Sequence, residues 1–248
     1  MAGPGSPRRI ALLGGAGGIG RALVASLRSK GDEVIVLDLA ETLERHPPDT
    51  PAIAVDIHSE ASIAEAVGDL SLRWPTLDGF VNLAGYNNRI EPLADTPTDY
   101  FDDILAVNLR GLFLSTKAVL PLIAEGGSAV LIASGLGQYI RPNYGPYAAS
   151  KAGVIALAKT FALENAPAVR VNAVAPGAVD TAFLRGGTGR SDETADPDIP
   201  VDAYVANLPL RRLAQPDDIV GPIAFLLGPD SRYMTGQVLW VNGGAYMP

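Results

Sequence analysis

The chain has 248 residues, 48% of them hydrophobic, and its formal net charge at pH 7 is −8. This length and apolar fraction predict one domain with a sizeable core, and the acidic balance excludes the basic footprint of a nucleic-acid-binding or anionic-membrane-binding protein. Cysteine is absent and the only histidines are His46 and His58, which excludes disulfides and thiolate metal sites; we expect no metal.

The N-terminal end shows no secretory signal. Residues 1–7 read as a flexible leader outside the fold, and 8–248 as the single domain. No uninterrupted apolar run reaches the roughly 18 residues that cross a bilayer. We therefore expect a cytoplasmic protein that does not bind membranes.

An apolar strand at 8–13 is followed by a glycine-rich turn and then by a helix that carries Leu23, Val24 and Leu27 on one face. Glycines let the backbone approach a pyrophosphate, which a helix N-terminus attracts. The turn is therefore a candidate dinucleotide site. Its candidate residues are Gly14, Gly17, Gly18, Ile19 and Gly20.

The second strand, 33–37, ends at Asp38. An acid at this distance from the glycine turn typically binds the adenosine ribose hydroxyls, and its carboxylate would repel the 2′-phosphate of NADP. Asp38 therefore predicts NAD as the cofactor. The alternative is an aspartate that only caps a turn at the end of a strand.

Strand and helix patterns alternate to the end of the chain. This alternation predicts an α/β fold of one Rossmann-type domain, a doubly wound parallel sheet with helices on both faces and the cofactor across its carboxyl ends. We expect strands at 8–13, 33–37, 52–59, 77–85, 128–133, 169–177 and 237–246, and helices at 21–31, 60–70, 98–125, 147–164 and 215–227.

The stretch 134–151 brings a hydroxyl, a phenol and an ammonium together. Ser134 ends a buried strand, and Gly145-Pro146 begins a helix on which Tyr147 and Lys151 share a face at positions i and i+4. A nearby cation favours the phenolate, so we expect Lys151 to lower the pKa of Tyr147 from its usual value near 10. The pair alone also arises by chance on amphipathic helices, and Ser134 makes the pattern more specific.

The set of Ser134, Tyr147 and Lys151 resembles the catalytic residues of the short-chain dehydrogenase/reductase family, in its common soluble type, and the match covers nearly the whole chain. The resemblance implies that Tyr147 is the general acid/base and that Ser134 hydrogen-bonds the same substrate oxygen. It implies that Lys151 binds the nicotinamide ribose, and that Asn108, in the preceding helix, completes a proton relay.

The resemblance also implies cofactor contacts outside the glycine turn. Leu83 replaces the second asparagine of the family's Asn-Asn-Ala-Gly element, and NADP-binding members often have a basic residue where this chain has Gly17 or Leu39. The implied contacts are Asp56 and Ile57 at the adenine, Asn82, Ala84 and Gly85 nearby, and Pro176, Gly177, Val179 and Thr181 at the nicotinamide carboxamide.

These observations predict an NAD-dependent oxidoreductase that interconverts a secondary alcohol and a ketone of a small molecule. One alternative is an NADPH-dependent 3-oxoacyl-(acyl-carrier-protein)-type reductase, against which Asp38 argues. Another is a non-catalytic dinucleotide-sensing protein, since a fold does not fix a function. The resemblance further implies a homotetramer built through the helices at 98–125 and 147–164.

Residues 183–200 are polar and rich in glycine and aspartate. We expect a mobile loop that closes over the nicotinamide pocket with Phe183 and Leu184 as apolar cover; the alternative is a merely flexible surface loop. Its expected hinges are Gly186, Gly187 and Gly189. The candidate substrate-site residues are Tyr86, Asn87, Asn88, Gln138, Tyr139, Arg141 and Tyr144.

Overall fold

The computed structural model describes residues 7–188 and 191–247, so the expected leader, apart from Pro7, and the expected hinge Gly189 lie outside the described residues. Seven parallel strands form one sheet in the order β3-β2-β1-β4-β5-β6-β7. The strands are β1 (Arg9–Leu13), β2 (Glu33–Asp38), β3 (Ala52–Ala54), β4 (Leu77–Asn82), β5 (Ile123–Ile132), β6 (Arg170–Pro176) and β7 (Val238–Val241).

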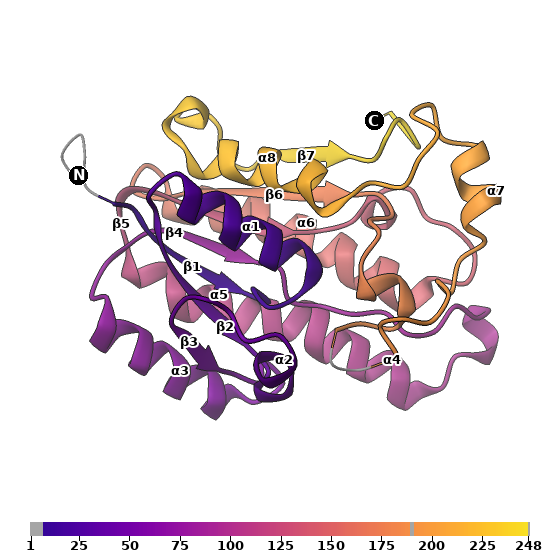
Figure 1. Cartoon of the computed structure of the whole chain (residues 1–248), viewed down its shortest axis with the longest axis horizontal. Coiled ribbons are helices and arrows are strands. Elements are labelled where there is room, and N and C mark those ends of the chain that lie inside the picture. Colours follow the sequence, from indigo (N-terminus) through magenta and orange to yellow (C-terminus); the bar gives the residue numbers. More distant parts are fainter. Residues whose placement is uncertain (1–6, 189–190, 248) are drawn as a thin grey trace.

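Helices cover both faces of the sheet, as predicted, with α1 and α8 on one face and α3 to α6 on the other (Figure 1). The helices are α1 (Gly18–Ser29), α2 (Ala40–Arg45), α3 (Glu60–Arg73), α4 (Thr98–Leu105), α5 (Leu112–Val119), α6 (Gly145–Asn165), α7 (Val201–Ala206) and α8 (Pro216–Leu227). Shorter turns are η1 (Leu93–Asp95), η2 (Ala106–Gly111), η3 (Leu120–Leu122), η4 (Gly135–Gly137), η5 (Ala182–Arg185) and η6 (Pro229–Ser231).

The two cores follow from the alternation of side chains along each strand. Ile10 and Leu12 of β1 face the cluster formed with α1 and α8, whereas Ala11 and Leu13 face the cluster formed with α3, α5 and α6. All four are at most 3% exposed. Because both faces are covered, β1 reads as a continuous apolar run.

The predicted helix 98–125 is one helical run in four parts: α4, the π-helical η2, α5 and the 3₁₀ turn η3. Its predicted end is wrong by three residues. Ile123 pairs with Leu77 of β4, which draws residues 123–125 into β5. The pair Gly126-Gly127, expected to end the helix, lies in an irregular part of β5 where Gly126 adopts a φ of 87°.

Several other boundaries differ from the prediction, among them the ends of the strands expected at 77–85 and 237–246, which lie at Asn82 and Val241. The strand expected at 52–59 ends at Ala54, because Asp56 begins a turn in which its carboxylate accepts a hydrogen bond from the backbone N–H of His58. The short helices α2 and α7, of six residues each, were not predicted. They are too short to show a helical period.

The helical run Thr98–Leu122 is long and apolar enough to cross a membrane on length and composition alone. Half of its most apolar window is buried inside the protein. It packs between the sheet and its neighbours α3 and α6, which accounts for its apolar character without a membrane.

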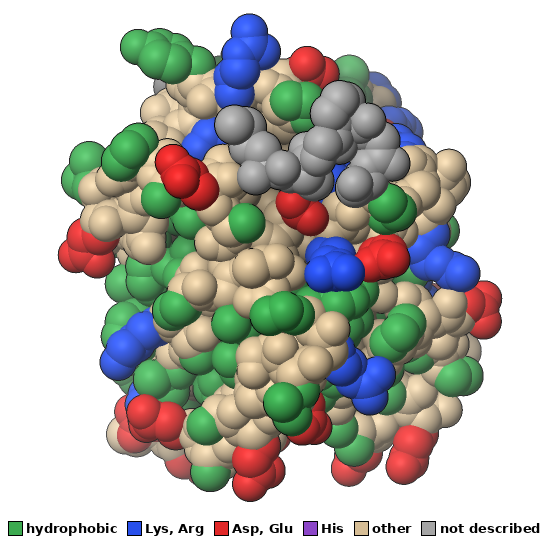
Figure 2. Space-filling model, turned by 90° about the vertical axis from the view of Figure 1, so that its left-hand side faces the viewer, with side chains coloured by type: hydrophobic (Ala, Val, Ile, Leu, Met, Phe, Trp, Pro, Cys, Tyr) green, Lys and Arg blue, Asp and Glu red, His purple; other side chains and the backbone are tan. Residues whose placement is uncertain are grey.

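The order of the strands places the site. From β1 the chain proceeds to β2 and β3 on one side, and then returns to β4 on the other side of β1. Ligands of such sheets bind outside the carboxyl ends of the strands at this point of reversal. The carboxyl ends lie at the right of Figure 1, near α4 and α7. The opposite end of the molecule carries interspersed acidic, basic and apolar side chains (Figure 2).

Candidate active site

A cavity of about 900 Å³ lies at the carboxyl ends of the strands. It is lined by all of the residues predicted to be catalytic or cofactor-binding except Asn82 and Asn108. The lining predicted residues are Gly14, Gly17, Gly18, Ile19, Gly20, Asp38, Asp56, Ile57, Ala84, Gly85, Ser134, Tyr147, Lys151, Pro176, Gly177, Val179 and Thr181.

Several positions of the glycine turn have no room for a side chain. A Cβ added to Gly14, whose φ is 80°, would lie 2.9 Å from the backbone nitrogen of Ala84, and one added to Gly18 would lie 2.6 Å from Cγ2 of Thr181. Gly18 is the first residue of α1, so the N–H groups of that helix start lie at the cavity wall. A bare turn at a helix N-terminus fits a pyrophosphate.

Asp38 is fixed at one end of the cavity. Its Oδ2 accepts a hydrogen bond from the backbone N–H of Ala16 at 2.9 Å, and its Oδ1 accepts one from Leu39 at 2.8 Å. Burial raises the pKa of Asp38, while these two hydrogen bonds act in the opposite direction. Both oxygens retain acceptor capacity, so this carboxylate fits the two hydroxyls of an adenosine ribose.

The chain after β4 also places a glycine, Gly85, on the cavity wall. A Cβ on Gly85 would lie 3.0 Å from Oδ1 of Asn108 and 3.4 Å from Nζ of Lys151. Gly85 therefore leaves open the space in front of the lysine ammonium. Ile57, 7% exposed, lines the adenosine end together with the exposed Asp56.

Asn82 lies behind the cavity wall rather than on it. Its side chain is fully buried, and its Nδ2 donates hydrogen bonds to Ser115 at 3.0 Å and to Thr116 at 3.4 Å, both on α5. Its Oδ1 accepts from the backbone N–H of Ala84 at 3.3 Å. The structure thus gives Asn82 a supporting position, in which it holds Ala84 against the cavity.

The structure brings together Ser134, Tyr147 and Lys151, the residues expected to be catalytic. Ser134 follows β5, and its Oγ accepts a hydrogen bond from the N–H of Leu136 at 3.2 Å. Tyr147 lies in the first turn of α6, and Ser134 forms a hydrogen bond with its phenol. Nζ of Lys151 lies 5.7 Å from the centre of the Tyr147 ring and donates to the carbonyl of Ile132 at 2.8 Å.

The expectation that the pKa of Tyr147 is lowered is wrong in this structure. Burial of the phenol raises its pKa, and the hydrogen bond from Ser134 only partly opposes the effect. Burial also lowers the pKa of Lys151 to about 8. Desolvation disfavours the charged form of both groups. The lysine ammonium is directed to the Ile132 carbonyl and does not offset the burial of the phenol.

Asn108 lies in the π-helical part η2 and is fully buried. Its Oδ1 accepts from the backbone N–H of Tyr86 at 2.9 Å, and its Nδ2 donates to the Tyr86 carbonyl at 2.8 Å. The side-chain amide is thereby used to hold the backbone of Tyr86, which lines the cavity. The structure thus gives this side chain a positioning role, and the proton relay expected for Asn108 stays a prediction.

Aromatic side chains line the substrate end of the cavity. The rings of Tyr139 and Tyr246 stack at 4.0 Å, and the ring of Phe183 lies 5.7 Å from that of Tyr147. Tyr246 and Tyr204 also line the cavity and were not predicted as site residues. Tyr246 follows β7, which ends at the carboxyl edge, and this position could have indicated it. Tyr204 lies within the short helix α7 and has no such signal in the sequence. Of the candidate substrate-site residues, Tyr86, Asn87, Tyr139, Arg141 and Tyr144 line the cavity, and Asn88 and Gln138 do not.

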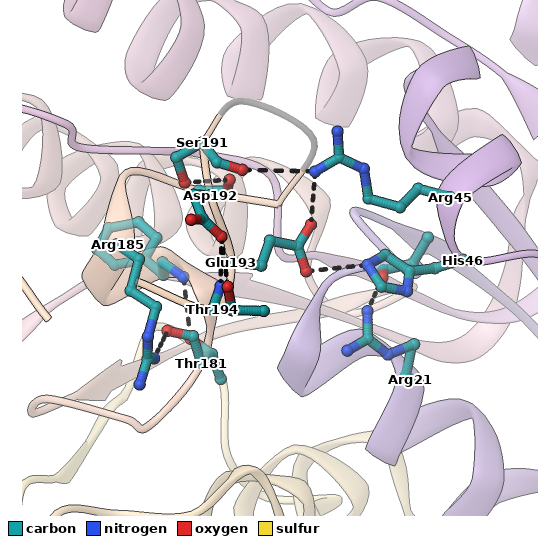
Figure 3. Close-up of polar contacts among 12 residues, drawn as sticks. Arg21, Arg45, His46, Thr181, Arg185, Ser191, Asp192, Glu193 and Thr194 are labelled. Atoms are coloured by element: carbon teal, nitrogen blue, oxygen red, sulfur yellow. Dashed lines mark hydrogen bonds and ion pairs between the residues drawn. The ribbon is translucent and has the colours of Figure 1, made fainter. Parts of the chain in front are cut away.

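The segment predicted as a loop, 183–200, lies along the cavity in its described parts. Phe183 and Leu184 line the cavity as expected. Further along, Glu193 accepts from the His46 ring at 2.9 Å and pairs with Arg45 at 3.4 Å, both at the end of α2 (Figure 3). The segment therefore touches both the nicotinamide side of the predicted site and the helix that follows Asp38.

Comparisons with known proteins agree with this site. A family model described as enoyl-(acyl carrier protein) reductase matches residues 14–246. Levodione reductase of Leifsonia aquatica is 30% identical over 253 residues, which cover 96% of this chain and 93% of that protein. The 3-oxoacyl-[acyl-carrier-protein] reductase of Thermotoga maritima is 33% identical over 244 residues, which cover 94% and 95%.

Solved structures show the same fold. The aldohexose dehydrogenase of Thermoplasma acidophilum aligns with a TM-score of 0.86 at 25% identity, over 98% of this chain and 96% of that chain. A short-chain dehydrogenase/reductase of Brucella melitensis, titled glucose/ribitol dehydrogenase, aligns with a TM-score of 0.86 at 28% identity, over 97% of each chain.

Proposed function

This chain belongs to the short-chain dehydrogenase/reductase family, and from that membership we propose that it interconverts a secondary alcohol and a ketone with NAD as the cofactor. The family makes it an oxidoreductase acting on CH–OH or keto groups with a nicotinamide dinucleotide. The observation that carries the proposal is the placement of Ser134, Tyr147 and Lys151 together on the wall of a cavity that extends to Asp38.

Each catalytic side chain has one task in this proposal. Ser134 donates a hydrogen bond to the substrate oxygen, and Tyr147 gives a proton to that oxygen in reduction or takes one from it in oxidation. Lys151 supplies positive charge behind the phenol. The cofactor, when bound, supplies or accepts the hydride. Because the pKa of Tyr147 is raised, its phenol is protonated at neutral pH, which suits it to donate to a ketone.

The cofactor would be held along the length of the cavity. The glycine turn and the start of α1 would bind the pyrophosphate, Asp38 the adenosine ribose, and Lys151 the nicotinamide ribose. The remaining contacts would come from Asp56, Ile57, Ala84, Gly85, Pro176, Gly177, Val179 and Thr181, all on the cavity wall.

NAD is proposed over NADP because of the charges at the adenosine end. The Asp38 carboxylate would repel a 2′-phosphate. Of the described residues that line the cavity, only Arg141 and Lys151 are basic, and neither is near Asp38 in the chain. A 2′-phosphate would thus meet an anion with no compensating cation from the lining residues.

The second candidate is a reductase of 3-oxoacyl groups on an acyl carrier protein. The Thermotoga maritima relative favours it, and the description of the matching family shares the acyl carrier protein but names the reduction of an enoyl group. It would use NADPH, so the cofactor preference separates the two candidates. It would also prefer a thioester substrate to a free alcohol.

A panel of alcohols, ketones and one 3-oxoacyl thioester, assayed with NAD(H) and NADP(H) in parallel, tests the proposal. We expect turnover of an alcohol or ketone with NAD(H) and a lower catalytic efficiency with NADP(H). Tyr147→Phe should lower kcat by about 10²-fold or more while NADH still binds. Tyr233→Phe, at a fully exposed tyrosine, is the matched control. Equal efficiencies with both cofactors, or an active Tyr147→Phe variant, would refute the assignment.

We also propose that the chain is a homo-oligomer, as the resemblance implied for a tetramer. A shallow apolar groove runs along α4, η2 and α5 beside α6, and Leu109, Phe113 and Leu157 lie in it. Light scattering should give a mass above that of one chain, and Leu109→Asp should reduce it. A monomeric wild type would refute this part alone.

A further inference from the structure

One cationic side chain lines the cavity without a role in the chemistry above. Arg141 lies between η4 and α6, at the substrate end. Within the described part of the cavity wall the other basic side chain is Lys151, and its ammonium donates to the Ile132 carbonyl. Arg141 is therefore the cation that a substrate meets at this end.

An aromatic ring, and not an acid, holds the Arg141 guanidinium. Its Cζ lies 5.7 Å from the centre of the Tyr204 ring on α7. Over residues 7–188 and 191–247, no hydrogen bond or ion pair engages its N–H groups. A ring that supports the face of a guanidinium leaves the edge, with its N–H donors, available to a planar anion.

Arg141 and Tyr147 line the same cavity, and Tyr144, which lies between them in the chain, lines it too. Arg141 acts on Tyr144: burial raises the pKa of that phenol, and the Arg141 charge is the largest effect that lowers it. Tyr144 in turn acts on Tyr147, three residues later in the chain. Arg141, Tyr144 and Tyr147 therefore form one electrostatically connected group on the cavity wall.

The opposite charge at this end is Asp198, which also lines the cavity and acts on Tyr144. Asp198 and Arg141 form no ion pair. The charges are held apart because Arg141 is placed by Tyr204, whereas the Asp198 backbone is hydrogen-bonded to Leu184 at 2.8 Å. A ligand can therefore contact the guanidinium without displacing a protein carboxylate.

We infer that the substrate carries an anionic group, a carboxylate or a phosphate, and that Arg141 binds it and so determines specificity for hydroxy and keto anions. The inference rests on the proposed function, because it assigns a substrate class to the same site. A charged, bidentate contact of this kind discriminates strongly between an anion and its neutral analogue.

The test compares matched pairs of substrates. Hydroxycarboxylic acids of four to eight carbons are assayed with NAD beside their methyl esters, and hydroxyalkyl phosphates beside the corresponding neutral diols. The wild type should prefer the anion in at least one series, which also identifies the anionic group. Arg141→Gln should lower kcat/KM for that anion by about 10- to 100-fold, mainly through KM, and for the neutral partner by less than about threefold.

Two variants sharpen the result. Arg73→Gln removes an exposed arginine at the end of α3 and should leave kcat/KM unchanged for both the anion and its neutral partner. Arg141→Lys retains the charge but not the planar fork, and should recover part of the loss. Three results would overturn the inference. The wild type could prefer the neutral partners, or Arg141→Gln could lower kcat/KM equally for both members of a pair. The wild type could also prefer amino alcohols, with a preference that Asp198→Asn abolishes.

A binding measurement separates this inference from the proposed function. Calorimetric titration of the same hydroxy acids and phosphates into the protein with NADH requires no turnover. Weaker binding of an anion to Arg141→Gln, but not to Arg73→Gln, would support the anion site even if no alcohol were oxidised. Absence of binding by every anion of the panel would overturn it even if neutral alcohols were good substrates.

Discussion

Lys151 is 3% exposed and shares the cavity wall with Tyr147. The burial that brings it to the catalytic phenol also lowers its pKa to about 8. Between about pH 8 and 10.5, the unfolded chain therefore keeps a proton that the folded chain has released. The contribution of Lys151 to the free energy of unfolding therefore rises with pH across that window and is constant below it.

The variant Lys151→Met tests this sign. As the pH is raised from 8 to 10, the free energy of unfolding of the wild type should increase relative to that of the variant, with a slope on the order of 1 kcal/mol per pH unit. Urea unfolding at four pH values measures it. Lys159→Met, which removes an exposed lysine of the same helix, is the control. A difference that does not change with pH would contradict the effect of burial.

Whether the role of a single residue could be predicted depended on whether its contacts are local in the chain. Ser134, Tyr147 and Lys151 were predicted because strand ends and helix periodicity place them from sequence alone. The partners of Asn82 and Asn108 were not visible in the sequence, since Ser115 and Tyr86 are distant in the chain. The pKa of Tyr147 was mispredicted because the sequence shows the neighbouring cation but not the burial.

Among the elements, the π-helical segment η2 is the one that bears on the site. It places Asn108 so that its amide holds both the backbone N–H and the carbonyl of Tyr86, which is 4% exposed. Such π-helical turns often occur at functional sites. Here the segment joins the helical run 98–122 to the chain that follows β4.

Asn108→Ala should leave the N–H and the carbonyl of Tyr86 without these partners. Burial of two such groups predicts a loss of about 2–4 kcal/mol in the free energy of unfolding. Asn165→Ala, which removes one partly buried hydrogen bond to the Phe161 carbonyl, should cost about 1 kcal/mol or less. Chemical denaturation of the two variants compares them, and equal losses would contradict the positioning role of Asn108.

The elements were largely predictable because a doubly wound sheet repeats one pattern. The misplaced end of the helix 98–125 shows where the sequence pattern fails to predict a boundary. Glycine pairs end helices and also form irregular positions in strands, and only the pairing of Ile123 with Leu77 decides between them. The three-residue β3 is an edge strand of the sheet, and its end is set by the Asp56 turn.

At the scale of the whole molecule, the segment after β6 links the two ends of the cavity. It begins with Thr181 against Gly18, Thr188 follows near Gly17, and Glu193 reaches Arg45 and His46. The side chain of Glu193 is 17% exposed, so its charge is only partly screened by solvent.

We expect NAD with a substrate analogue to increase hydrogen-exchange protection across 183–188 and 191–200. Glu193→Gln should reduce that gain and weaken NAD binding by up to about fivefold, because a partly exposed ion pair contributes about 1 kcal/mol or less. Glu44→Gln removes an exposed acid from α2 and is the control. Protection that does not respond to ligand would leave only a flexible surface loop.

The contacts of the segment after β6 predict the order in which the cofactor and the substrate bind. Parts of this segment, 183–184, 187–188 and 198–200, line the cavity, and its Glu193 pairs with Arg45 and His46 at the end of α2, the helix that follows Asp38. A dinucleotide in the cavity would therefore lie against this segment. We expect a compulsory order, in which NAD binds before the alcohol and NADH leaves after the ketone. Product inhibition by NADH should then be competitive against NAD, whereas the ketone should inhibit noncompetitively against NAD.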